Sequence, residues 1–406
     1  MVAIDDILRT ALDHDASDIH LKVGAPPFLR RFGHLGPEES FGPLSDEDLR
    51  GIIAQMSDEK QRQRLETDRQ LDLGYGSEGI GRFRVNVYHQ RGELRIAMRA
   101  IPRNIRSLDQ LQLPPIVETL AKESRGLVLV TGTTGSGKST TLASMIDLLN
   151  QTEALHMITV EDPIEYEHED KLSIISQREV GVDVVSFAAG LKGALRQDPD
   201  VILVGEMRDL ETIETAIMSA ETGHLVMSTL HTLDAPETVT RVIQAFPDHQ
   251  REQIRVVLSS VLKGIISQRL VPKADGNGLV PAIEIMVNTA LVRDIIKDPT
   301  RSPRELTDAI AKGNISYGTQ TFDQSLMALF RRNLITYDEA LRQATNPDDF
   351  ALQVSGISST SNARWDDFDK PHDDSVPTAP GEQAKPGTQD KPTGTSRQLP
   401  RLVKRF

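Results

Sequence analysis

The sequence predicts an α/β fold organised around a glycine-rich loop. Residues 127–130, Leu-Val-Leu-Val, form an apolar run suited to a buried strand. Residues 132–139 then match the pattern G-x-x-x-x-G-K-[ST] of a P-loop without a mismatch. After the loop, apolar residues recur at helical spacing, and further apolar runs alternate with helical patterns. This order of strand, loop and helix predicts a mostly parallel sheet with the P-loop at its carboxyl edge.

The residue types of the P-loop suit a bound polyphosphate. Glycines let successive backbone N–H groups turn toward phosphate oxygens, and the helix N-terminus adds partial positive charge. We predict that Lys138 contacts the β and γ phosphates, that Ser139 holds Mg²⁺ and that Thr140 touches the α-phosphate. ATP and Mg²⁺ are therefore the predicted ligands, and the alternative is a chance glycine-rich turn. The predicted nucleotide-binding residues are Thr133, Thr134, Gly135, Ser136, Gly137, Lys138, Ser139 and Thr140.

Composition limits the class of protein. A chain of 406 residues has room for two or three domains, because single cores rarely grow past about 250–300 residues. The net charge of −13 argues against nucleic acid as a partner, and the absence of cysteine excludes disulfides and thiolate zinc sites. The first residues are acidic and carry no continuous apolar segment, so we expect no signal peptide. No apolar run is long enough for a membrane span, and we expect a cytoplasmic protein.

The first part of the chain predicts a small α+β domain over residues 1–101. Helical spacing near its start gives way, from residue 70, to alternating apolar residues separated by glycine turns, which indicates an antiparallel sheet. Residues 102–115 form the expected linker to a larger domain. Arginines are frequent on the predicted strands, where they either form a solvated face or present charge to an anionic ligand. They are Arg82, Arg84, Arg91, Arg95 and Arg99.

Three further apolar runs each deliver a polar group to the end of a predicted strand. Residues 156–160 lead to Glu161, residues 200–205 lead to Glu206, and residues 224–229 lead toward His231. Ligands of parallel sheets gather at the carboxyl ends of the strands, so these side chains are candidates for the site. Helical patterns over residues 210–220 and 237–245 separate the strands.

Each candidate has a functional and a structural interpretation. Glu206 stands where P-loop proteins keep an acidic group for the Mg²⁺ shell or the attacking water, and the alternative is a structural carboxylate. Glu161 either polarises water or caps the following turn. His224 and His231 either sense the γ-phosphate or are satisfied structural groups.

The remaining chain predicts helices and then a tail. Residues 285–350 follow helical spacing, and Thr321 and Thr336 each begin a capping box. From residue 355 the apolar periodicity disappears and prolines become frequent, so residues 355–406 are predicted to be disordered. The basic and apolar end of this tail is either a tethered binding peptide or a plain disordered terminus.

Four sequence blocks together resemble the secretion and type IV pilus ATPase superfamily, and most closely its PilT-like retraction ATPases. The blocks are the Walker A segment GTTGSGKST, the acidic box ITVEDPIEY, the Walker B segment DPDVILVGEMRD and the histidine box GHLVMSTLHT. The C-terminal segments PAIEIMVNTALVRDIIK and QTFDQSLMALFRRNLITYDEAL are also similar to those of the family. The resemblance covers residues 1 to about 355. It implies a PAS-like N-terminal domain, a RecA-like core with its helical part over residues 116–354, and a hexameric ring with nucleotide between the two domains.

The resemblance also assigns roles to residues. It implies that Glu206 is the catalytic Walker B glutamate and, with Ser139, a metal ligand, and that Glu161 is the acidic-box glutamate. His224 and His231 match the histidine-box positions. The matching arginines, which would neutralise charge on the transferred phosphoryl group, are Arg84, Arg99 and Arg196. Lys192 departs from the arginine usual in the superfamily and lacks its bidentate fork, which puts a contact between subunits in doubt.

The function implied by the resemblance is an ATP-hydrolysing hexameric motor for type IV pilus retraction and twitching motility. Such a motor would work at the pilus base, peripherally on the inner membrane, with the platform protein of the pilus machine as partner. Pilus assembly or secretion ATPases are the alternative within the superfamily, but they usually carry a longer N-terminal extension and a tetracysteine zinc site. A RecA-like nucleic-acid translocase and a nucleotide-gated partner without hydrolysis are the alternatives from other classes.

Overall fold

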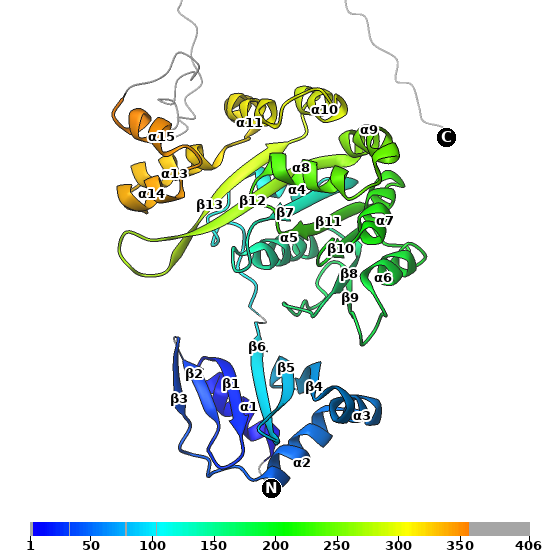
Figure 1. Cartoon of the computed structure of the whole chain (residues 1–406), viewed down its shortest axis with the longest axis vertical. Coiled ribbons are helices and arrows are strands. Elements are labelled where there is room, and N and C mark those ends of the chain that lie inside the picture. The colour runs from blue at the N-terminus through cyan, green and yellow to red at the C-terminus, as the bar shows by residue number, and fades with distance from the viewer. Residues whose placement is uncertain (1–2, 32, 78, 103, 357–406) are drawn as a thin grey trace, which may run out of the picture. The chain divides into compact units, whose positions relative to one another are not determined.

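The computed structural model describes residues 3–31, 33–77, 79–102 and 104–356. The predicted disordered tail falls, beyond residue 356, outside the described residues. The described chain contains a six-stranded sheet in the order β3-β2-β1-β6-β5-β4 and a seven-stranded sheet in the order β13-β12-β7-β11-β10-β8-β9 (Figure 1). We call them the N-terminal sheet and the C-terminal sheet. Together with their helices they make an α/β protein, as predicted.

The N-terminal sheet is antiparallel, as the alternating pattern predicts. Side chains at alternate positions, such as Phe83, Val85 and Val87, are buried, because successive strand residues face opposite sides of a sheet. The elements are α1 (Ile4–Asp13), β1 (Ala16–Lys22), β2 (Phe28–Arg31), β3 (His34–Pro37), α2 (Asp46–Met56), α3 (Glu59–Asp68), β4 (Gln70–Ser77), β5 (Gly81–Gln90) and β6 (Glu93–Ile101). The helices α2 and α3 each begin with a capping box, which fixes their starts.

The C-terminal sheet is parallel except for one edge strand. Its strands are β7 (Gly126–Thr131), β8 (His156–Glu161), β9 (Ile174–Glu179), β10 (Val201–Val204), β11 (Leu225–Leu230), β12 (Leu262–Pro272) and β13 (Leu279–Val287). Strands β7, β8, β10 and β11 are those predicted from apolar runs, whereas β9, β12 and β13 were not predicted. Only β13, among these strands, pairs in the antiparallel sense.

Each region predicted to be helical from its apolar spacing contains helices, although residues 285–287 belong to β13. The helices over residues 187–194 and 248–261 were not predicted from spacing. The helices of this part are α4 (Ile116–Ala121), α5 (Lys138–Thr152), α6 (Phe187–Ala194), α7 (Leu210–Glu221), α8 (Ala235–Gln244), the 3₁₀ helix η1 (Asp248–Gln250), α9 (Arg251–Val261), α10 (Ala290–Lys297), α11 (Pro303–Lys312), α12 (Asn314–Tyr317), α13 (Phe322–Arg331), α14 (Tyr337–Gln343) and α15 (Pro347–Val354). Helix α13 has the predicted capping box at Thr321. At α14, Thr336 accepts the N–H of Glu339, but the Glu339 side chain binds Arg342 and Gln343. The predicted box at Thr336 is therefore half formed.

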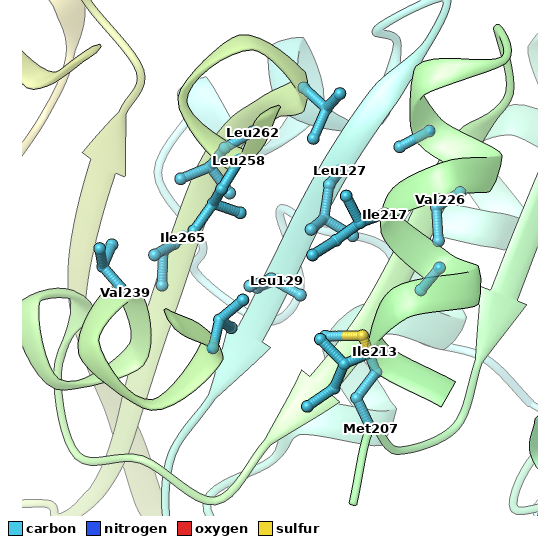
Figure 2. Packing of buried hydrophobic residues seen from close by; sticks show 14 of the residues in the cluster. Leu127, Leu129, Met207, Ile213, Ile217, Val226, Val239, Leu258, Leu262 and Ile265 are labelled. Atoms are coloured by element: carbon cyan, nitrogen blue, oxygen red, sulfur yellow. The ribbon is translucent and has the colours of Figure 1, made fainter. Parts of the chain in front are cut away.

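Strand β7 lies at the centre of two hydrophobic clusters. Its side chains alternate, so Leu127 and Leu129 join the cluster built with α7, α8 and α9, while Val128 and Val130 join the cluster built with α4 and α5. Figure 2 shows Leu127 and Leu129 beside Ile217 of α7. Each of these four side chains is at most 1% exposed, and burial of such a side chain contributes about 1.5–3 kcal/mol. The strand that carries the P-loop is thus held rigidly on both faces.

None of the helices in the described part of the chain is both long and apolar enough to cross a membrane.

Candidate functional site

The P-loop begins directly after β7, where the backbone requires glycine. Gly132 has a φ of +140°, and a Cβ at this position would overlap the backbone oxygen of Gln268 and lie 2.5 Å from the Ser136 hydroxyl oxygen. Gly137, at φ +91°, is the N-cap of α5. Side chains with a Cβ rarely adopt such angles, whereas glycine does so readily. The glycines therefore permit the tight turn that brings backbone N–H groups to the start of α5.

Lys138 is the first residue of α5 and is buried. Its Nζ donates to the carbonyl oxygens of Gly132 at 2.9 Å and Thr133 at 3.0 Å. Burial lowers the pKa of Lys138, and the carboxylates of Glu206 and Glu165 oppose this effect. The Ser136 hydroxyl is buried and has no hydrogen-bond partner among the described residues. A buried ammonium, a free hydroxyl and a helix N-terminus in one loop fit a polyphosphate.

Glu206 follows β10 at the same end of the sheet. Its carboxylate contacts Arg208 Nη2 at 2.8 Å and His231 Nε2 at 3.2 Å. Burial by itself would raise the pKa of Glu206, but the hydrogen bond from Arg208 and the adjacent His231 lower it below the ordinary value. Glu206 is therefore ionised at neutral pH. Its carboxylate and the hydroxyl of Ser139 are oxygen donors of the kind that Mg²⁺ takes, since this ion commonly binds one or two protein oxygens and completes its shell with phosphates and water; that both hold one ion stays a prediction.

Glu161 ends β8, which lies beside β10 in the sheet. The two strand ends are joined where Gly205 N–H donates to the carbonyl oxygen of Val160 at 2.8 Å. The Thr159 hydroxyl donates to Glu161 Oε1 at 2.7 Å. Burial raises the pKa of Glu161, in contrast to the lowered pKa of Glu206. Two neighbouring carboxyl groups with opposite pKa shifts are suited to different roles in proton transfer.

The two histidines of the histidine box lie at opposite ends of β11. The pairing of β11 with β7 places Leu230 beside Thr131, so His231 follows β11 at the P-loop end. His224 precedes β11 at the other end, where its Nδ1 lies 3.0 Å from the carbonyl oxygen of Ser219. A strand of 6 residues spans about 20 Å. The two histidines therefore lie far apart within one chain, and a contact of either with phosphate stays a prediction.

The predicted arginines lie away from the P-loop in sequence and are exposed. Arg84 on β5 and Arg99 on β6 are direct partners across the N-terminal sheet, and Arg99 Nε donates to Asp18 Oδ1 at 2.9 Å. Arg196 lies on the connection that enters β10 at its amino end. Lys192 Nζ contacts Glu211 Oε1 at 2.6 Å, which engages its charge within the same subunit. Contacts of these arginines with phosphate stay predictions.

Several contacting residues were not predicted. Arg208 lies inside the Walker B segment and Tyr166 inside the acidic-box segment, so both could have been chosen as candidates from the sequence. Arg208 holds Glu206, and the Tyr166 hydroxyl lies 2.8 Å from the Thr140 hydroxyl. Gln177 lies on β9, a strand that the apolar pattern did not reveal, and its amide donates to Glu161 Oε1 at 3.3 Å. Nothing in the sequence pattern indicated this residue.

The whole chain can be compared with known proteins. Residues 1–297 match the family described as Type II/IV secretion system protein. The chain is 41% identical over 347 residues to the type IV pilus retraction ATPase PilT of Pseudomonas aeruginosa, covering 86% of this chain and 99% of the relative. It is 42% identical to a twitching motility protein of Neisseria gonorrhoeae, covering 86% and 92%. The crystal structure of the pilus retraction motor PilT with bound ADP superposes with a TM-score of 0.79 at 46% identity, covering 86% and 98%. The chain therefore belongs to the type II/IV secretion system protein family and is a PilT-like member of it.

Proposed function

We propose that the protein is an ATPase that powers type IV pilus retraction and, through it, twitching motility. The proposal depends on one observation: the lysine of the P-loop, an acidic side chain and a histidine lie at the same end of the C-terminal sheet. There the negative charge of Glu206 opposes the lowering of the pKa of the buried Lys138, and the Glu206 carboxylate contacts His231. Relatives that match almost their full length to this chain are named as a retraction ATPase and a twitching motility protein.

The residues have complementary roles in this proposal. Lys138 and the backbone of the P-loop bind the phosphates of ATP, and Ser139 and Glu206 hold Mg²⁺, which neutralises phosphate charge when it is bound. Glu206 stays ionised and orients the attacking water. His231 holds the Glu206 carboxylate, and Glu161, with its raised pKa, is able to hold a proton near that water.

We further propose a PAS-like domain over residues 1–101, a linker over 102–115 and a RecA-like core with helical part over 116–354, assembled as a homohexamer. Arg84, Arg99 and Arg196 are exposed, which leaves their guanidinium groups accessible to phosphates bound by another domain or subunit. The proposed partner is the inner-membrane platform protein of the pilus machine. The protein would then work on the cytoplasmic side of that membrane, at the pilus base.

The ATPase assignment is tested with the purified protein and two substitutions. Lys138→Ala should weaken nucleotide binding strongly, because it removes the ammonium from the phosphate loop. Glu206→Gln should retain binding and lose about 100-fold or more in turnover, because a neutral amide orients water poorly. Lys122→Ala removes an exposed lysine that pairs with Glu118 and serves as a control with normal activity. Wild-type turnover in Glu206→Gln would contradict the role of that residue.

The closure of the site is tested through the exposed arginines. Arg84→Ala, Arg99→Ala and Arg196→Ala should each lower turnover more than nucleotide affinity, because they act on charge that develops during hydrolysis. Arg50→Ala, on the exposed face of α2, is the matched control. Normal turnover in all three variants would contradict closure. Mass photometry that shows only monomers with and without nucleotide would contradict the ring.

The direction of work is tested in cells. Deletion of the gene should leave surface pili present, in excess, while pilus shortening and twitching stop. Bald cells that regain pili when the gene is restored would show an assembly motor instead.

A further inference from the structure

Gln177 lies beside Glu161 and contacts both its carboxylate and two backbone groups of the segment that follows Glu161. Strands β8 and β9 are parallel neighbours, with Thr159 opposite Gln177. The Gln177 Nε2 donates to the carbonyl oxygen of Tyr166 at 2.8 Å and to Glu161 Oε1 at 3.3 Å. Its Oε1 accepts the backbone N–H of His168 at 2.8 Å. Both halves of the amide are engaged, which a carboxylate or an apolar side chain of similar length cannot reproduce.

These contacts fix the orientation of the Glu161 carboxylate. Oε1 accepts from both Thr159 at 2.7 Å and Gln177, while Oε2 lies 3.4 Å from the backbone N of Glu165. Two donors on one oxygen prevent the carboxylate from rotating, so the second oxygen keeps one direction. Without Gln177, Oε1 would keep the Thr159 hydroxyl as its donor, and Oε2 would keep the weaker contact with the Glu165 N–H.

The same segment reaches the P-loop helix. The Tyr166 hydroxyl lies 2.8 Å from the Thr140 hydroxyl, and Thr140 follows Ser139 at the start of α5. The Gln177 amide donates both to the Glu161 carboxylate and to the backbone carbonyl of Tyr166. It therefore connects Glu161 with Tyr166, whose hydroxyl contacts the P-loop helix α5.

We propose that Gln177 is a positioning residue for ATP hydrolysis. It holds the Glu161 carboxylate and, through Tyr166, fixes the position of this carboxylate relative to the P-loop helix. The inference rests on the proposed ATPase function. Gln177 acts through Glu161 and Tyr166 and is not itself a catalytic residue.

Two substitutions test the inference. Gln177→Met keeps the length of the side chain without its amide, and Gln177→Asn keeps an amide that is one methylene too short. In each, kcat should fall about tenfold or more while KM changes less than about threefold, because losing a hydrogen bond to a charged group is costly in the transition state.

In the Glu161→Gln background, Gln177→Met should cause no further loss of kcat. Amide hydrogen exchange should become faster in residues 162–168 of Gln177→Met, because the His168 N–H loses its acceptor. Gln151→Met, which removes an exposed glutamine amide on α5, is the control for all measurements.

The outcomes separate the inference from the proposed function. Unchanged exchange in residues 162–168, normal kcat in both Gln177 variants, or losses additive with Glu161→Gln would each overturn the inference while wild-type hydrolysis stands. A wild-type protein that binds ATP but does not hydrolyse it would overturn the proposed function, and the role of Gln177 in hydrolysis with it.

Discussion

The two ends of the C-terminal sheet carry similar residues in different environments. At the amino end, polar side chains are satisfied by backbone groups: the Asp200 carboxylate accepts the backbone N–H of His156 at 2.8 Å, and His224 Nδ1 lies 3.0 Å from the carbonyl oxygen of Ser219. At the carboxyl end, ionisable groups face one another, as Glu206 does with Arg208 and His231. Histidine and carboxylate side chains thus contact backbone groups at one end and charged side chains at the other. Residue type alone therefore does not identify a functional site. The end of the strand at which a residue lies determines whether its side chain contacts backbone groups or charged side chains.

The comparison is tested most strongly by one glycine from each end. Gly132→Ala should destabilise the protein by at least about 3 kcal/mol and abolish nucleotide binding, since the new Cβ overlaps backbone and φ is unfavourable. At Gly223, at the amino end, an added Cβ would meet no atom of the described part of the chain within 4 Å, but φ is +113°. Gly223→Ala should therefore cause only strain of about 1–3 kcal/mol and retain binding. Urea unfolding and nucleotide titration measure both. Equal losses of binding in the two variants would contradict the comparison.

The second test uses a buried carboxyl group at the same end of the C-terminal sheet as the P-loop. Glu284 on β13 lies in the row of Ser267 and Thr131, and it accepts the N–H of Ala235 at the start of α8 at 2.8 Å. Burial raises its pKa from 4.5 to about 7; Asp234 and Asp323 act in the same direction, and Arg269 opposes them.

A raised carboxyl pKa means that the folded state holds the proton longer than the unfolded state. The contribution of Glu284 to stability is thus fully present below pH 4.5 and is lost as pH rises through about 7. Glu284→Gln should match the wild type near pH 4.5 and become more stable than it by at most about 3 kcal/mol at pH 8. Urea unfolding at several pH values measures the difference. A difference that does not depend on pH would show that Glu284 does not titrate in this range.

The third and smallest effect separates the two histidines. His231→Ala should lower kcat about tenfold, because Glu206 loses a partner that orients it. His224→Ala should change kcat less than about twofold and cost about 1 kcal/mol of stability through its lost contact with Ser219. Steady-state ATPase assays and thermal unfolding measure both variants. A large loss of kcat in His224→Ala with normal stability would mean that His224 reaches a nucleotide, for instance one bound by a neighbouring subunit.

Much of the site could be predicted because it depends on short-range patterns. The P-loop needs glycines and a lysine at set spacings, and Glu161 and Glu206 follow apolar runs that form buried strands. Even the separation of the histidines follows from their positions before and after β11, although the sequence-based expectation grouped them. Strands β9, β12 and β13 escaped prediction, since their apolar residues are interrupted by polar ones such as Ser267, Gln268 and Glu284.

By itself the sequence determined the P-loop, the order of strand and helix, and the acidic group that ends each of two core strands, because these depend on neighbours along the chain. The tertiary structure decided which charged groups and which amide lie beside each acidic side chain. Arg208 and His231 lower the pKa of Glu206, burial raises that of Glu161, and Gln177 reaches Glu161 from an edge strand. Burial, strand register and the pairing of charges arise only when distant segments pack together, and the chemistry of this site depends on all three.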